Sequence, residues 1–213
     1  MDFSRLLDLV GDEPVFETAL LLAGEVDPAA VRLQLSRWKA SGRIYQLRRG
    51  LYALAPPYQK TNPHPFVIAN RLRRASYVSC QSALAYDGLI PEVVPVTVSV
   101  TTARPARWKT PLGVYEFHHI QPNLLRGYQV TDLGGGQQAF VATPEKALLD
   151  LVYLQPGGDS PAYIQELRLQ NLERLNLGEL ARQVEQAGIA KLRRAADIVA
   201  ELVRREAGEY ETL

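Results

Sequence analysis

The sequence has very little cysteine and lacks long apolar runs. Its single cysteine, Cys80, excludes an internal disulfide and a cysteine-based zinc site, and we interpret it as a small buried side chain. The apolar stretches are too short to span a membrane, and the N-terminus lacks the basic and then apolar pattern of a signal peptide. We therefore expect a cytoplasmic protein with no membrane partner. A chain of 213 residues with 46% hydrophobic residues can bury a core and is long enough for two domains.

Acidic residues are absent from a long stretch of the chain. Residues 28–86 contain ten Lys and Arg and no Asp or Glu, whereas residues 1–27 contain seven acidic residues and one basic residue. An ordinary solvated surface mixes both signs. A protein that binds a polyanion gains from releasing condensed counterions, and every misplaced carboxylate would repel its partner. The segregation therefore indicates a nucleic-acid partner, with chance segregation as the alternative.

The N-terminal residues predict three helices, over residues 3–10, 16–23 and 28–41. The third helix has the clearest start, because Asp27 can accept a hydrogen bond from an exposed amide as the N-cap and Pro28 suits the first helical position. Val31, Leu35 and Trp38 recur at helical spacing and form its apolar stripe. The basic residues between them should therefore point away from the core.

Two short strands are predicted after the third helix, over residues 43–47 and 51–54. They flank Arg48-Arg49-Gly50, which places two arginines at the tip of a hairpin. The order of three helices and a hairpin is that of a winged helix-turn-helix, in which the third helix enters the major groove of double-stranded DNA and the hairpin contacts the backbone or the minor groove. A small helical domain that binds protein is the alternative.

The candidate DNA contacts are the basic and polar residues that the predicted elements leave outside the core, continued into the segment beyond the hairpin. They are Arg32, Ser36, Arg37 and Lys39 on the third helix, Arg43, Arg48 and Arg49 on the hairpin, and Arg71, Arg73 and Arg74 beyond it.

Four prolines among residues 56–65 mark a domain boundary. We predict a DNA-binding domain at 1–55, a proline-rich linker at 56–63 and a second domain at 64–213. The second domain is expected to have helices at 66–74, 80–88 and 144–154, strands at 77–79, 95–101, 114–120, 128–132 and 138–141, and a helical remainder after residue 158. The fold class is therefore α+β, a winged helix-turn-helix followed by a mixed α+β domain with a helical tail.

Two segments of the second domain stand out, SCQSALAYDGLI at 79–90 and ATPEKALLDL at 142–151. Together with the hairpin segment at 42–52, with GRI at its start and RGLY at its end, they resemble the AbiEi family of antitoxins over about residues 1–155. The resemblance implies the antitoxin of a type IV toxin–antitoxin pair in antiviral defence. Such a protein represses its own operon through the winged helix, and its C-terminal domain opposes a nucleotidyltransferase-like toxin without binding it stably.

The resemblance also has consequences for partners and for site residues. The DNA partner would be the protein's own operator. Inverted repeats in it would need two copies of the protein, either a stable homodimer or monomers that pair only when bound to DNA. Glu145, Lys146 and Asp150 are the polar members of the second segment and are candidates for an antitoxicity surface. From the residues alone, both segments are most simply capped amphipathic helices whose Leu84, Leu148 and Leu149 pack a core.

A magnesium-dependent nuclease is the main enzyme alternative, with candidate ligands at Asp87, Glu116, Glu145 and Asp150. The strand that carries Glu116 lacks the following Glu-x-Lys that such sites use. His118 and His119 would point to opposite faces of that strand and cannot both bind one metal. We therefore expect no enzyme, no catalytic residue, no metal and no cofactor, and we keep a DNA-tethered interaction module or nucleic-acid enzyme as the alternative.

Overall fold

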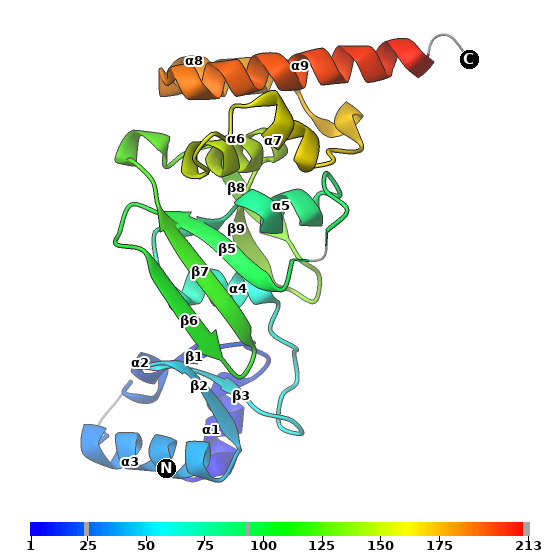
Figure 1. The fold of residues 1–213 in the computed structure, drawn as a ribbon. Coiled ribbons are helices and arrows are strands. Elements are labelled where there is room, and N and C mark those ends of the chain that lie inside the picture. Colours follow the sequence, from blue (N-terminus) through cyan, green and yellow to red (C-terminus); the bar gives the residue numbers. More distant parts are fainter. Residues whose placement is uncertain (24–25, 93, 211–213) are drawn as a thin grey trace.

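The computed structural model describes residues 1–23, 26–92 and 94–210, which form a mixed α+β protein with two sheets (Figure 1). No helix among these residues has the length and apolar character needed to cross a membrane. The N-terminal unit, residues 1–54, has a three-stranded sheet of order β1-β3-β2. Its elements are α1 (Phe3–Val10), β1 (Phe16–Glu17), α2 (Thr18–Leu21), α3 (Pro28–Ala40), β2 (Ile44–Arg48) and β3 (Leu51–Leu54).

The start of α3 confirms the sequence prediction. The Asp27 carboxylate accepts a hydrogen bond from the Ala29 amide at 2.8 Å, and Pro28 occupies the first turn. Val31, Leu35 and Trp38 are buried in the core of the N-terminal unit. These contacts fix one side of α3 and leave the other side to solvent.

The predicted helix over residues 16–23 is wrong in its first part. Phe16 and Glu17 form a short strand that pairs with β3, with Phe16 opposite Tyr52, and the helix is reduced to Thr18–Leu21. The Phe16 ring stacks on the Tyr52 ring at 5.8 Å between centroids. Pairing with a strand far along the chain therefore overrides the local apolar spacing that suggested a helix.

The C-terminal body, residues 65–210, is built on a six-stranded sheet of order β6-β7-β5-β4-β9-β8. Its strands are β4 (Ser76–Val78), β5 (Val96–Thr101), β6 (Ala106–Thr110), β7 (Gly113–His119), β8 (Tyr128–Asp132) and β9 (Gln138–Ala142). Its helices are α4 (Pro65–Leu72), α5 (Cys80–Tyr86), α6 (Pro144–Leu154), α7 (Pro161–Glu166), α8 (Leu177–Ala187) and α9 (Ala190–Tyr210), with 3-10 turns at Pro122–Leu124 and Leu172–Arg174. The predicted helices and strands of this region are present with ends shifted by up to two residues. The helix predicted over 66–74 ends at Leu72, so Arg73 and Arg74 follow it, and β6 was not predicted.

The N-terminal unit lies at one end of the molecule and α8 and α9 lie at the other end (Figure 1). Between β3 and α4 the chain forms no helix or strand. Apolar contacts nevertheless join the two parts, because Leu47, Leu51 and Ala53 of the hairpin belong to the same buried cluster as the core of the C-terminal body. The hairpin is therefore packed on both sides, against α3 and against the body.

Candidate nucleic-acid interface

The solvent-exposed side of α3 carries two parallel rows of side chains. Arg32, Ser36 and Lys39 follow one another at helical spacing and form the first row, and Leu33 and Arg37 form the second. All five residues are exposed. Because the opposite side of α3 is locked into the core, this face is presented as a preformed surface.

The hairpin lies directly beside this face of α3. The Lys39 ammonium donates a hydrogen bond to the Gln46 side-chain oxygen on β2 at 2.9 Å. Arg49, at the turn between β2 and β3, is exposed. The helix and the hairpin are thus joined at Lys39 and Gln46, and each carries exposed basic residues.

Arg43 is occupied within the N-terminal unit. Its guanidinium lies over the Phe3 ring, with Cζ 4.9 Å from the ring centroid, and its side chain is half-buried. Its backbone amide donates to the carbonyl of Trp38 at 2.9 Å. The structure therefore gives Arg43 a role in holding the end of α3 against α1, and its contact with DNA stays a prediction.

Arg48 and Arg74 fasten the N-terminal unit to the C-terminal body. The Arg48 guanidinium donates to the carbonyl of Arg71, at the end of α4, at 3.2 Å. The Arg74 guanidinium donates to both carboxylate oxygens of Glu17, at 3.0 and 3.1 Å. Either arginine would have to exchange an existing partner in order to bind a phosphate.

Arg73 lies against aromatic rings of the large sheet. Its Cζ atom is 5.1 Å from the Trp108 ring centroid and 5.6 Å from the Phe117 ring centroid. Such cation–π contacts hold a guanidinium in place and use its flat face. Arg73 is thereby the least accessible of Arg71, Arg73 and Arg74.

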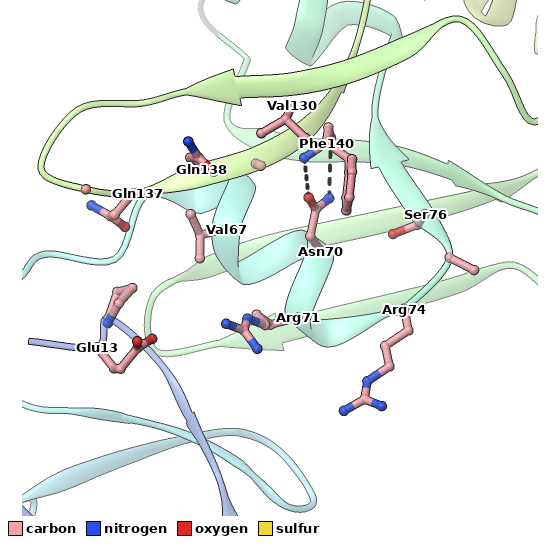
Figure 2. A pocket seen from close by; sticks show the side chains of 14 residues that line it. Glu13, Val67, Asn70, Arg71, Arg74, Ser76, Val130, Gln137, Gln138 and Phe140 are labelled. Atoms are coloured by element: carbon pink, nitrogen blue, oxygen red, sulfur yellow. Dashed lines mark hydrogen bonds between the residues drawn. The ribbon is translucent and has the colours of Figure 1, made fainter. Parts of the chain in front are cut away.

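Arg71 is exposed and lines a groove of about 610 Å³ between the N-terminal unit and the C-terminal body (Figure 2). Glu13 of the N-terminal unit, Arg74 and Phe140 of β9 also line it. The Asn70 side chain bridges α4 to β9, because it accepts from the Phe140 amide at 2.6 Å and donates to the Phe140 carbonyl at 3.5 Å. Arg71 is thus an exposed basic residue beside a mixed polar and apolar groove, and its contact with DNA stays a prediction.

Two residues of this surface were not predicted from the sequence. Leu33 is 52% exposed although it is a large apolar residue, and Gln46 is the polar side chain that joins β2 to Lys39. Leu33 could have been found, because it lies outside the Val31, Leu35 and Trp38 stripe. An exposed leucine on a helix that enters the major groove can contact the methyl group of thymine.

Glu145, Lys146 and Asp150 lie inside the protein and not on its surface. Their exposed fractions are 4%, 5% and 1%. The Glu145 carboxylate accepts a hydrogen bond from the Asn176 amide at 2.8 Å, just before α8. These residues can form no contact surface in this conformation, and a contribution to antitoxicity would have to pass through the packing of α6.

Asp150 is the centre of a buried polar network that joins the two segments, 79–90 and 142–151. Its carboxylate accepts from the Ser79 hydroxyl at 2.7 Å and from the Tyr77 hydroxyl at 3.0 Å, and it pairs with the Lys146 ammonium one turn away on α6. Burial raises the pKa of the Asp150 carboxyl above its usual value, and its hydrogen-bond donors, Lys146 first, oppose that shift. The network ties α6 to β4 and to the start of α5.

Three of the four candidate magnesium ligands, Glu116, Glu145 and Asp150, already have side-chain or backbone partners. The Glu116 carboxylate pairs with Arg107 at 3.2 Å and with the His118 ring at 3.6 Å, and Asp150 is enclosed by its own donors. Within residues 1–23, 26–92 and 94–210, no group of three or more His, Cys, Asp and Glu side chains could hold a metal ion.

No protein-family model matches the chain, and no curated protein matches it. The function is therefore inferred from the contacts and charges of the chain's own residues and from the sequence resemblance described above.

Asp87, another of the candidate ligands, has a pKa raised to about 6. Burial is the largest cause, Arg174 opposes it, and Glu145 adds to it. The Asp87 carboxyl holds its proton more tightly in the folded protein than in the unfolded chain, so it stabilises the fold at pH values below its unfolded pKa. This stabilisation is lost as the pH rises through about 6. We therefore expect Asp87→Asn to be more stable than the parent protein at about pH 8 and about equally stable near pH 3, below the unfolded pKa, as measured by urea unfolding.

Asp159 provides a matched control with the opposite sign. The hydrogen bond from Arg194 lowers the pKa of the Asp159 carboxyl, so its ionised form stabilises the fold above its unfolded pKa. Asp159→Asn should therefore be the less stable protein at about pH 8. An Asp87→Asn variant that is also less stable than the parent at that pH would contradict the assignment.

Proposed function

We propose that this chain is a sequence-specific DNA-binding repressor whose N-terminal unit is a winged helix-turn-helix. In this proposal α3 is the helix that enters the major groove, and the β2–β3 hairpin is the wing that contacts the backbone or the minor groove. The observation that carries it is the exposed face of α3, which carries Arg32, Arg37 and Lys39 within residues 28–86, a stretch that has no acidic residue, and which is joined to the hairpin through Lys39. An exposed basic helix beside a hairpin is the arrangement with which winged helix-turn-helix domains bind double-stranded DNA.

The rigidity of this surface supports the proposal. The apolar stripe of α3 is buried, and the hairpin is held between α3 and the C-terminal body. Arg48 and Glu17 add polar contacts to the same body. A reading helix must keep a fixed position against its groove, because misplaced side chains lose the directional contacts that distinguish bases.

The antitoxin part of the proposal rests on the resemblance to the AbiEi family. The chain would repress its own operon and oppose a nucleotidyltransferase-like toxin without forming a stable complex with it. The two segments that carry the resemblance come together at Asp150, through Ser79 on one side and Lys146 on the other. Their co-occurrence is consistent with a shared structural role in the C-terminal body, which would act as the antitoxicity domain.

Gel shift across a series of salt concentrations tests the DNA-binding proposal. The wild-type chain should bind the duplex upstream of its own gene, and its affinity should fall steeply with salt. A scrambled duplex of the same length and composition should bind at least about 10³-fold more weakly. Equal affinity for both duplexes would overturn the repressor proposal. Growth rescue on co-expression with a neighbouring nucleotidyltransferase-like gene tests the antitoxin part.

A further inference from the structure

Strand β8 is an edge of the six-stranded sheet and has a neighbour on one side only. It pairs antiparallel with β9, from Tyr128 opposite Ala142 to Asp132 opposite Gln138, without a bulge or a shift of register. An edge strand presents unpaired backbone groups along its free side. The spacing of those groups on β8 follows from the hydrogen bonds that close the hairpin.

Alternate residues of β8 hydrogen-bond to β9. The Leu133 amide donates to the Gln137 carbonyl at 2.9 Å, and the Thr143 amide donates to the Gly127 carbonyl at 3.0 Å, at the two ends of the ladder. In an antiparallel pair, every second opposed pair exchanges both of its backbone bonds. The bonded pairs within the strands are therefore Gln129 with Val141 and Thr131 with Ala139.

The backbone groups of the other β8 residues point away from β9. The same alternation turns the Phe140 amide and carbonyl away from β8, and both of them bind Asn70 (Figure 2), which supports the assigned pattern. The outward donors and acceptors of β8 are thus those of Tyr128, Val130 and Asp132. They are spaced two residues apart and are centred on Val130.

Other strand edges in the described part of the chain are protected against pairing, and β8 is not. Edge strand β6 follows Pro105 and carries exposed Arg107 and Lys109, β2 has a bulge, and β1 is two residues long. Prolines, positive charges, bulges and short length are the devices by which proteins prevent pairing of edges. Strand β8 has the sequence YQVTD, with no lysine, no proline and no bulge.

Apolar side chains on β8 and its neighbour are also exposed. Tyr128, Val130 and Phe140 are 40%, 55% and 47% exposed, and they share one face of the hairpin because Val130 is opposite Phe140. The Tyr86 hydroxyl, 3.5 Å from the Asp132 carbonyl, touches only the end of the strand. The β8 edge therefore combines an open backbone ladder with an apolar patch.

We propose that β8 pairs antiparallel with β8 of a second copy of this chain, with the two Val130 residues opposite each other. The strand is self-complementary in this register, because Val130 faces Val130 and Tyr128 faces Asp132 of the second copy. The outward backbone donors of each copy therefore lie opposite the outward backbone acceptors of the other. The charges agree with this direction, since basic Arg126 precedes the strand and acidic Asp132 ends it. Parallel pairing would place like charges together.

The proposed interface is small, which sets its strength. A pair of five-residue strands falls below the roughly 1,200 Å² that specific stable interfaces bury. We therefore expect a reversible dimer that forms as the protein concentration rises. The dimer does not depend on DNA. The dimer proposal can therefore fail while the proposed repressor function holds, and the repressor proposal can fail while the dimer forms.

Disulfide trapping tests the register directly. In a hydrogen-bonded antiparallel pair, opposed Cα atoms are about 5.5 Å apart, within the range that a disulfide spans. Val130→Cys should therefore form a disulfide-linked dimer under mild oxidation, and Asp132→Cys, which faces Tyr128 of the partner, should not. The native Cys80 is 1% exposed and should not react. Monomeric Val130→Cys, or equal cross-linking of both variants, would overturn the proposal.

Sedimentation of the proline variant tests it without a cross-link. The Val130 amide points outward, so Val130→Pro removes a bond of the dimer and leaves the bonds between β8 and β9 intact. We expect wild-type mass to rise with concentration and Val130→Pro to stay monomeric with an unchanged unfolding midpoint. Wild-type protein that stays monomeric at every concentration would contradict pairing with a second copy. In that case the partner of the β8 edge would be a strand from another protein.

Discussion

Replacing Arg37 and Arg49 by alanine should lower the affinity for the operator duplex by about 10- to 100-fold and reduce the slope of log affinity against log salt by about two. Arg37 is exposed on α3 and Arg49 is exposed at the tip of the hairpin, so both are free to meet phosphates or bases. Each lost phosphate contact leaves about one counterion bound to the DNA. Fluorescence anisotropy at several salt concentrations measures the affinity and the slope together.

The double variant Arg204→Ala/Arg205→Ala is the matched control. It removes the same charge from exposed arginines of α9, which lies at the end of the molecule away from the N-terminal unit (Figure 1). Its affinity should stay within about twofold of the parent, because these arginines are far from the proposed interface. If the two double variants lose affinity equally, binding depends on net charge and not on the face of α3.

Lys146→Met should lower the free energy of unfolding by about 3–5 kcal/mol, because it leaves the Asp150 carboxylate buried without its cationic partner. The side chains of Lys146 and Asp150 are 6% and 1% exposed, so water cannot replace the lost ammonium. Ser79 and Tyr77 would remain as donors, and neither compensates a full charge. Urea unfolding followed by circular dichroism measures the difference.

A second substitution at Asp150 separates the charge from the packing. Lys146→Met/Asp150→Asn removes both charges and keeps a side-chain oxygen that can accept from Ser79 and Tyr77. Most of the lost stability should return, because replacing a buried ion pair as a whole is far less costly than breaking it. A double variant as unstable as Lys146→Met would show that Lys146 acts by its packing and not by its charge.

Local signals in the sequence predicted the elements that local interactions determine. Asp27 and Pro28 mark the start of α3, and the Val31, Leu35 and Trp38 stripe gives its buried side. Strand β1 was missed because it depends on a partner far along the chain, whereas β6 pairs with the next strand, β7, and was missed because its own residues show little apolar alternation. Phe16 extends only because Tyr52 lies beside it, and Trp108, the large apolar residue of β6, gives too weak a pattern alone.

At the candidate site, too, features set by local spacing could be predicted, and contacts between distant segments could not. The outward direction of Arg32, Arg37 and Lys39 follows from helical spacing alone. The partners of the other arginines do not, because Arg74 meets Glu17 only after the two parts of the chain pack together. Ser79 and Asp150 are 71 residues apart in the sequence, and nothing in either segment shows that they share a hydrogen bond.

Methylation interference on the upstream duplex tests the central claim, that α3 binds in the major groove, most directly. Guanine N7 lies in that groove, so its methylation blocks contacts that a side chain makes there. We predict that the bound fraction is depleted of duplexes methylated at specific guanines, and that Arg37→Ala abolishes the depletion at one or more of them. A bound fraction that carries methylated guanines at every position as often as the free DNA would contradict major-groove binding by α3.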